Sequence, residues 1–287
     1  MLLRSLLFVP GNNEKVIAKA EQLPADVIIY DLEDAVALDQ KADARERVCA
    51  ALSATAKSVV VRVNSMETPY FLDDIQAVAS VKADTIRAIM LPKTNRDADV
   101  MALDQLLTSL DVPANVEILP LLETALGVQN AFDIGCSSDR VKRLAFGSVD
   151  FGLDIGATLT AEGTELLYAR SRIVLASRAA ELQKPIDTVF VDFRDTAGLE
   201  KEAVMVKGLG FGGKLAIHPA QVDSVNSIFQ PTQAEKEEAA EIMAYVEEHG
   251  AAVFQLHGKM VDEPIIKRAR QICQLAKMLD LKRQEEN

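Results

Sequence analysis

The stretch "VIIYDLEDAV", residues 27–36, places three carboxylates directly after an apolar run. Asp31, Glu33 and Asp34 fall within four positions. Like charges this close repel one another, and they are costly to desolvate where a strand leaves a core. Two interpretations stay open: the chain turns into water at this point, or the carboxylates hold a cation.

Single polar residues follow other apolar runs along the chain in the same way. The runs are "SVVVRVN", "AIMLPK", "VEILPLLET", "RLAFGSVD", "DTVFVD" and "GKLAIH", and they end at Arg62 with Asn64, Lys93, Glu123, Asp150, Asp192 and His218. Segments rich in helix formers lie between the runs, such as "NEKVIAKAEQL" and "TELLYARSRIVLASRAAEL". Apolar strands that alternate with helices predict a parallel sheet buried on both faces.

The number of strand–helix units favours one fold. Eight units in about 230 residues are typical of a (β/α)8 TIM barrel, which we predict for residues 1–230. An open doubly wound sheet is the alternative, but no G-x-G-x-x-G motif follows the first strand. Residues 231–287 are predicted to form a C-terminal helical extension that packs on the barrel or on a neighbouring subunit. It contains a helix over 232–249 that starts with Thr232 as its N-cap, a loop through "GAAVFQLHGKMVDEP" and a last helix over about 264–281.

A divalent metal is the simplest partner for these strand-end acids, because a TIM barrel gathers the carboxyl ends of its strands into one active site. Ligands that are all oxygen favour Mg²⁺, or Mn²⁺, over zinc. We predict Glu123 and Asp150 as the ligands, since they end neighbouring strands. Glu33 and Asp34 are predicted to bond metal-bound water or to orient Arg62. The alternative is that each acid is a helix cap or a solvated turn residue.

Four basic side chains have two interpretations each. Arg62 offers a planar fork to a substrate carboxylate, or it forms an ion pair with Asp31 or Asp34. Lys15 and Lys19 lie four apart, so they share one helix face that holds a phosphate or is merely solvated. His218, before Pro219, is structural more often than catalytic.

Composition excludes several classes of function. The 287 residues carry 31 Lys and Arg against 43 Asp and Glu, a formal net charge of −12, which argues against a nucleic-acid or membrane-surface partner. The three cysteines have neither disulfide nor zinc spacing. The apolar stretch after Arg4 is shorter than the core of a signal peptide. We therefore predict a cytoplasmic, soluble protein.

Several motifs in register resemble one known family. They are "RSLLFVPGNNEK", "DLEDAV" with "KADAR", "VRVN", "MLPK", "LPLLET", "FGSVDFGLDIG", "GFGGKLAIHPAQV" and "GKMVDEP". Their order is similar, nearly end to end, to that of the citrate lyase β-subunit-like group within the malyl-CoA lyase and class II aldolase superfamily. That resemblance implies a (β/α)8 barrel, in a homotrimer or a hexamer built from trimers.

The resemblance also implies roles for individual residues. Mg²⁺ is held by Glu123 and Asp150, and Arg62 grips the acid end of the substrate. The groove for a CoA thioester is lined by Phe8, Lys15, Lys19, Ile217 and His218. Asp262, which on sequence alone is a surface loop acid, is implied to be the catalytic acid/base, delivered by the C-terminal segment into a neighbouring subunit's site. One departure is His257, where many relatives have an acid.

The implied activity is a Mg²⁺-dependent carbon–carbon lyase reaction. It cleaves a 3-hydroxyacyl-CoA thioester, citramalyl-CoA or malyl-CoA, to acetyl-CoA and a 2-oxoacid. One alternative is a citrate lyase β-subunit that acts on a citryl acyl-carrier-protein thioester, together with the other subunits of that complex. A second is a metal-dependent aldolase of free 2-oxoacids, and a third is a binding subunit without catalysis.

Overall fold

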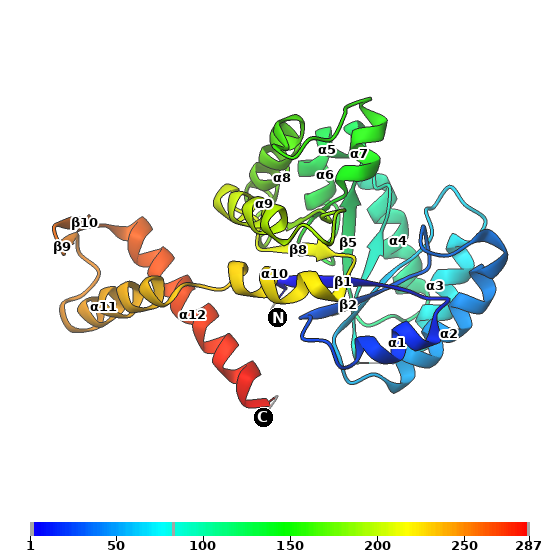
Figure 1. Cartoon of the computed structure of the whole chain (residues 1–287), viewed down its shortest axis with the longest axis horizontal. Helices are drawn as coiled ribbons and strands as arrows, with labels where there is room; N and C mark the ends of the chain where they lie inside the picture. The colour runs from blue at the N-terminus through cyan, green and yellow to red at the C-terminus, as the bar shows by residue number, and fades with distance from the viewer. Residues whose placement is uncertain (1–2, 82–83, 286–287) are drawn as a thin grey trace. The chain divides into compact units, whose positions relative to one another are not determined.

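The computed structural model describes residues 3–81 and 84–285. The described chain forms two compact units, one of residues 3–226 and one that begins at Ser227 (Figure 1). Each unit is a separate body with its own core.

The first unit is a closed barrel of eight parallel strands. Its strands are β1 (Ser5–Pro10), β2 (Val27–Asp31), β3 (Val59–Arg62), β4 (Ile86–Leu91), β5 (Glu117–Leu122), β6 (Ala145–Phe146), β7 (Ile186–Asp187) and β8 (Gly213–Ala216). β1 pairs in parallel with both β2 and β8, which closes the barrel. The predicted (β/α)8 barrel is confirmed, and the open sheet is excluded.

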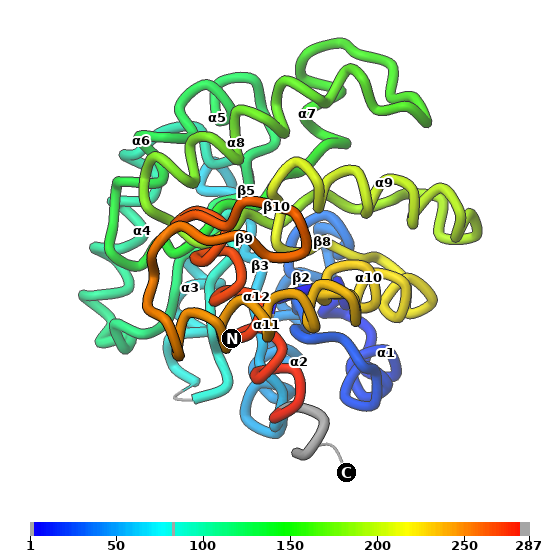
Figure 2. The backbone as a smooth tube through the Cα atoms, turned by 90° about the vertical axis from the view of Figure 1, so that its left-hand side faces the viewer, coloured from blue at the N-terminus to red at the C-terminus, as the bar shows by residue number. Residues whose placement is uncertain are grey.

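Helices surround the barrel (Figure 2). They are α1 (Glu14–Ala20), α2 (Lys41–Ala54), α3 (Phe71–Ser80), α4 (Asp97–Ser109), α5 (Ala125–Gln129), α6 (Ala131–Cys136), α7 (Ser148–Asp154), α8 (Leu167–Ala179), α9 (Thr196–Leu209) and α10 (Val222–Phe229). Alternate strand residues, such as Val27 and Ile29, fill the barrel interior as one cluster, while Ile28 between them is also buried. Burial on both faces explains why the strands appear in the sequence as unbroken apolar runs.

Four charged side chains form a network in the barrel unit, from strands β7 and β8 and helices α8 and α9. Asp187 accepts hydrogen bonds from Arg170 Nε at 2.9 Å and from Lys214 Nζ at 2.7 Å, and Lys214 also bonds Glu202 at 2.6 Å. Arg170, Asp187 and Lys214 have no exposed side-chain surface. Burial alone raises the pKa of Asp187, but the charges of Lys214 and Arg170 outweigh it and lower that pKa. We call these four residues the Asp187 network.

The second unit is a helical hairpin that carries a small sheet. It contains α11 (Gln233–His249), β9 (Phe254–Leu256), β10 (Lys259–Val261) and α12 (Glu263–Glu285). Val261 packs with Ile242 and Ile266 in its core. Helix α11 begins after Thr232, whose hydroxyl accepts from the Glu235 amide at 3.1 Å, as the sequence predicts.

The predicted loop after α11 contains an antiparallel strand pair. His257 and Gly258 link the two strands with φ of 48° and 77°, as a two-residue primed turn requires. The expectation of a plain loop was wrong because the strands have only three residues each and His, rather than Asn or Asp, precedes the turn glycine.

Within the described residues, no helix combines the length and apolar character needed to cross a membrane.

Candidate active site

A cavity of about 480 Å³ opens at the carboxyl ends of the barrel strands. Its lining comes from strand ends around the barrel, as the fold requires. Six of the residues predicted from the sequence line it, namely Phe8, Asp34, Arg62, Glu123, Asp150 and Ile217. The remainder of the wall is largely apolar, with Leu121, Val189 and Leu215 among its residues. We call this cavity the mouth cavity.

Arg62, the last residue of β3, meets its ion-pair partners from the "DLEDAV" stretch. Its Nε and Nη2 donate to the two oxygens of Asp31 at 2.7 and 2.6 Å, and Nη1 donates to Asp34 at 3.2 Å. The Phe8 ring lies under the guanidinium at 4.7 Å. Burial alone lowers the pKa of Arg62, but its hydrogen bonds with Asp31 raise it, so the side chain stays charged. The fork therefore faces Asp31, and the second N–H of Nη2 is the group left for a substrate oxygen.

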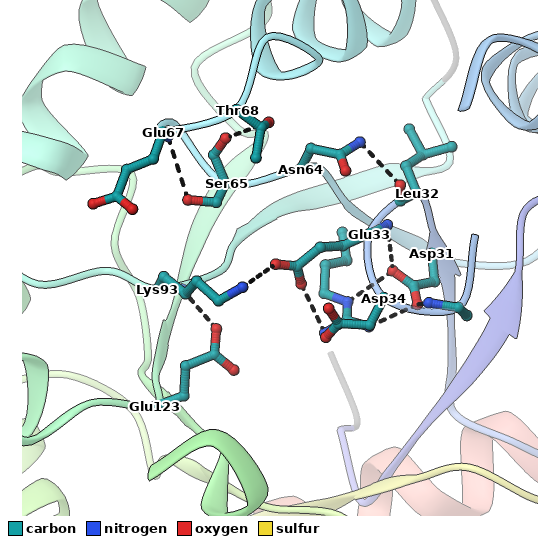
Figure 3. Close-up of polar contacts among 12 residues, drawn as sticks. Asp31, Leu32, Glu33, Asp34, Asn64, Ser65, Glu67, Thr68, Lys93 and Glu123 are labelled. Carbon is teal, nitrogen blue, oxygen red and sulfur yellow. Dashed lines mark hydrogen bonds and ion pairs between the residues drawn. The ribbon is translucent and has the colours of Figure 1, made fainter. Parts of the chain in front are cut away.

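Glu33 is buried beside this pair and connects Arg62 to Lys93. Its Oε2 lies 2.9 Å from Arg62 Nη1, and its Oε1 accepts from Lys93 Nζ at 3.2 Å (Figure 3). Burial raises the pKa of Glu33 in spite of the Arg62 charge. The acids of this stretch are therefore paired with cations, as in the sequence interpretation that pairs Arg62 with Asp31 or Asp34.

Glu123 follows β5 and is the most deeply buried acid of the mouth cavity after Asp31. Its Oε1 accepts the main-chain N–H of Lys93 at 2.7 Å (Figure 3). A Cβ placed on Gly147 would come within 2.8 Å of its Oε2, so the missing side chain at 147 leaves room for this oxygen. Burial, followed by the charge of Glu33, raises the pKa of Glu123 to about 8.

Asp150 lies in the first turn of α7 and lines the cavity with Glu123. Its charge is one of the causes that raise the pKa of Glu123, which places the two carboxylates within electrostatic reach of one another. No cluster of three or more His, Cys, Asp or Glu suited to a metal ion occurs in the described part of the chain. Two carboxylates with room for water and substrate fit Mg²⁺ or Mn²⁺, whereas zinc requires three or four protein ligands.

Ser148 and Thr188 are cavity residues that the sequence reasoning missed. Thr188 Oγ1 accepts the Ser148 N–H at 2.8 Å and lies 2.9 Å from the Ser148 hydroxyl. The sequence interpretation extended the seventh strand to Asp192, but β7 ends at Asp187. Asp192 is exposed in the following loop and accepts the Arg194 amide at 3.1 Å. The last residue of the run "DTVFVD", Asp192, is therefore not the end of the seventh strand.

Other predicted residues lie outside the cavity lining. Lys15 and Lys19 are exposed on α1. His218 Nδ1 accepts the Ala220 amide at 3.2 Å, and its ring stacks on Phe193 at 4.5 Å. Asp262 belongs to the second unit, where it precedes α12 and its Oδ1 accepts the Ile265 amide at 3.4 Å.

Known proteins resemble the chain over most of its length. The family model described as HpcH/HpaI aldolase/citrate lyase matches residues 4–219. Citrate lyase subunit beta of Leuconostoc mesenteroides subsp. cremoris is 37% identical over 286 residues, covering 96% of this chain and 93% of the relative. The (3S)-malyl-CoA thioesterase of Cereibacter sphaeroides is 37% identical over 278 residues, covering 93% and 92%.

Solved structures agree with the sequence comparisons. The protein CitE from Mycobacterium tuberculosis, in complex with magnesium, acetoacetate and coenzyme A, is 28% identical with a TM-score of 0.78, over 95% of this chain and 97% of that one. RipC from Yersinia pestis is 31% identical with a TM-score of 0.68, over 81% and 97%. With the barrel and its acidic mouth, these similarities show that the chain belongs to the HpcH/HpaI aldolase/citrate lyase family and is a lyase of that family.

Proposed function

We propose that the protein is a Mg²⁺-dependent carbon–carbon lyase that cleaves a 3-hydroxyacyl-CoA thioester, citramalyl-CoA or malyl-CoA, to acetyl-CoA and a 2-oxoacid. One observation carries the proposal: Glu123 and Asp150 line the same cavity as the charged Arg62, beside apolar residues. Such a cavity offers two acids to a cation, one N–H to a carboxylate and an apolar wall to the rest of an acyl group.

The reaction breaks the bond between C2 and C3 of the acyl chain. The hydroxyl on C3 loses its proton and becomes the carbonyl group of the 2-oxoacid, while the bonding electrons pass to C2 and form a thioester enolate. A proton returned to C2 gives the acetyl thioester, so no net proton is released. The protein must therefore hold the hydroxy-acid end, stabilise the enolate and supply an acid.

Three features of the mouth cavity serve these needs. Glu123 and Asp150 hold Mg²⁺, whose chemistry when bound is to polarise the hydroxyl and carboxylate oxygens as a Lewis acid. Arg62 keeps its second Nη2 N–H for the substrate carboxylate, because Asp31 fixes the guanidinium and Phe8 covers one face. Glu33 and Asp34 orient Arg62 and balance its charge.

The acid is assigned to Asp262 of a neighbouring subunit in a homotrimer or in a hexamer of trimers. Within the second unit, Asp262 is set at the junction of β10 and α12 by the buried Val261 before it. Exposed apolar side chains flank it, Met260 at 64% and Ile265 at 39% exposure. Apolar residues around a polar group are typical of a segment that docks on another surface. Lys15, Lys19, Ile217 and His218 are assigned to the CoA groove.

The thioester carrier has a second candidate, because relatives named citrate lyase subunit beta and (3S)-malyl-CoA thioesterase are both 37% identical to this chain. A β-subunit of a citrate lyase complex would take a citryl acyl-carrier-protein thioester and require partner subunits. A thioesterase would release CoA without breaking a carbon–carbon bond.

Product analysis separates these possibilities. The purified protein is incubated with Mg²⁺ and, separately, both stereoisomers of citramalyl-CoA, malyl-CoA and citryl-CoA, with the free acids as controls. Acetyl-CoA with a 2-oxoacid, abolished by EDTA, is the expected result. Free CoA with the intact hydroxy acid would indicate a thioesterase, and cleavage of a free acid would indicate an aldolase. No turnover of any of them, with turnover of a citryl carrier protein, would assign the β-subunit activity.

A complementation experiment tests the shared site. Asp262→Ala is expected to lower kcat by about 10²–10⁴, whereas Glu263→Ala, the neighbouring exposed acid, leaves it unchanged. Mixing inactive Asp262→Ala with inactive Arg62→Ala chains, unfolded and refolded together, restores activity if each site combines two chains. Wild-type turnover by Asp262→Ala would refute the assignment.

A further inference from the structure

Lys93 links two acids, Glu123 and Glu33, through two different groups. Its main-chain N–H donates to Glu123 at 2.7 Å, and its ammonium donates to Glu33 at 3.2 Å (Figure 3). We propose that Lys93 is a positioning residue for the metal site: its main chain orients Glu123 toward the cation, and its ammonium holds Glu33 away from it. This inference rests on the proposed function, because it takes Glu123 to be a Mg²⁺ ligand.

The main chain at Lys93 has an uncommon conformation. Its φ of 51° lies in the left-handed region, which a residue with a long side chain rarely adopts. Strain of this kind persists when the surrounding structure fixes it, and it gathers at functional sites. Here the conformation turns the Lys93 N–H toward the end of β5, where Glu123 accepts it.

The loop around Lys93 is fixed from several directions. The Thr94 amide donates to the Leu121 carbonyl at 3.3 Å, and the Thr94 hydroxyl bonds the Leu91 carbonyl at 2.8 Å. Asn130 donates to the Asn95 carbonyl at 2.8 Å. These contacts come from β4, β5 and the junction of α5 with α6, so the loop cannot relax without moving its neighbours. The structure thus determines where the Lys93 N–H points.

The consequence for Glu123 follows from its two oxygens. One oxygen, Oε1, is occupied by the Lys93 N–H. The other, Oε2, lies beside Gly147, which has no side chain to obstruct it. A buried carboxylate held by one oxygen presents the second in a fixed direction, which lowers the entropy lost when it binds a metal.

The ammonium acts on Glu33 by charge. Glu33 is buried between Arg62 and Lys93, with one oxygen near each cation. Its charge is the second largest cause, after burial, of the raised pKa of Glu123, so Glu33 lies within electrostatic reach of the metal ligands. An ion pair with Lys93 limits its competition for the cation. The same ammonium also adds positive charge next to the place of an anionic substrate.

The test of the main-chain role compares three variants that all lack the ammonium. Lys93→Gly, Lys93→Met and Lys93→Val differ in how well they tolerate φ near 50°, in that order. Binding of Mn²⁺ to the substrate-free protein, followed by electron paramagnetic resonance, is expected to be about 10-fold or more weaker in Lys93→Val than in Lys93→Met, and unimpaired in Lys93→Gly. Glu181→Val is the matched control, since Glu181 is exposed with φ of 57° after α8; its Mn²⁺ affinity should equal that of wild type.

Loss of the Lys93 ammonium is expected to raise Mn²⁺ affinity, whereas loss of the left-handed main-chain conformation is expected to lower it. Lys93→Met removes a positive charge, so it is expected to bind Mn²⁺ severalfold more tightly than wild type and an anionic 2-oxoacid severalfold more weakly. Lys93→Arg keeps the charge and should restore both affinities. A residue that served only stability would not move the two affinities in opposite directions.

Two results would overturn the proposal. Equal Mn²⁺ affinity of Lys93→Val and Lys93→Met would remove the main-chain role, and wild-type affinities in Lys93→Met would remove the ammonium's role. If Lys93→Val does not fold, amide exchange decides, because the Lys93 N–H should exchange faster in Glu123→Ala than in wild type. If Glu123→Gln binds Mn²⁺ as wild type does, the metal site itself is wrong, which is a separate failure.

Discussion

Two groups of charged residues in the barrel unit differ in their balance of charge. The Asp187 network matches two acids with two cations, and its Asp187 has a lowered pKa. The mouth cavity and its edge hold five acids, Asp31, Glu33, Asp34, Glu123 and Asp150, near three cations, Arg62, Lys93 and Lys41. Both Glu33 and Glu123 have raised pKa values. Burial is the largest cause of the shift for Asp187, Glu33 and Glu123 alike, so the balance of nearby cations against nearby acids decides its direction.

The difference separates a structural network from a binding site. In the Asp187 network every acid has cations within hydrogen-bonding distance, and a further ion would find no free charge. The mouth has more acids than cations around a cavity, which is energetically unfavourable for the protein by itself and favourable once a divalent cation binds. Excess acid in a cavity is thus a sign of function, while balanced buried charge is not.

The largest expected effect tests the Asp187 network, in which acids and cations balance. Arg170→Met leaves Asp187 and Glu202 with one cation between them, so we expect the free energy of unfolding to fall by about 3–5 kcal/mol. Turnover per folded molecule should stay unchanged. Denaturant unfolding checks this, with exposed Arg178→Met on the same helix as the control, expected within about 0.5 kcal/mol of wild type. A lower kcat in folded Arg170→Met would contradict the distinction between the two groups.

The next largest effect tests the mouth cavity, where acids outnumber cations, by adding Mg²⁺. Mg²⁺ at about 100 times its dissociation constant should stabilise the folded protein by about 2.7 kcal/mol. The rise in Tm measures it. Arg170→Met should respond to Mg²⁺ as wild type does, whereas Glu123→Gln should not respond at that concentration. An equal response of both variants would place the cation elsewhere.

Much of the fold was predictable from the sequence because its signals are local and repeated. Apolar runs alternating with helical segments predicted the closed parallel barrel, and the cap at Thr232 predicted the start of α11. The end of β7 and the short strands β9 and β10 were not predicted. The end of β7 was not apparent because apolar residues continue past Asp187 into the loop. The strands β9 and β10 were missed because strands of three residues carry almost no periodic signal.

The location of a site residue was predictable where that residue follows the end of a strand. Arg62, Glu123 and Asp150 line one cavity because they follow strands of one barrel. Contacts that depend on exact direction were not predictable: the Ser148–Thr188 hydrogen bonds and the main-chain donation from Lys93 to Glu123 need φ and ψ values that residue types do not reveal. Whether the Arg62 guanidinium bonds Asp31 or a substrate likewise depends on its side-chain rotamer, which the sequence does not reveal.

The third prediction concerns pH. Without metal, burial raises the pKa of Glu123 from its ordinary 4.5 to about 8 in the folded protein, so the folded state holds the extra proton between these pH values. Its contribution to stability is therefore complete below pH 4.5 and is lost as the pH rises through 8. From pH 6 to pH 8, in EDTA, wild type should lose about 2 kcal/mol more unfolding free energy than Glu123→Gln. Exposed Glu263→Gln should behave as wild type, and parallel curves for wild type and Glu123→Gln would contradict the raised pKa.

The smallest expected effect isolates geometry from charge. Gly147→Ala changes no charge and suits the local backbone, whose φ is −115°, but its Cβ would come within 2.8 Å of both Cβ and Oε2 of Glu123. Glu123 must then shift while Lys93 still holds Oε1, so we expect Mg²⁺ affinity to fall by about 10-fold, or 1.4 kcal/mol. Titration calorimetry measures this, and Gly208→Ala, where nothing lies within 4 Å of the added Cβ, is the control. Because the acids stay the same in number, a loss of affinity in Gly147→Ala alone would show that excess charge draws the cation to the mouth but the direction of Glu123 sets how tightly it is held.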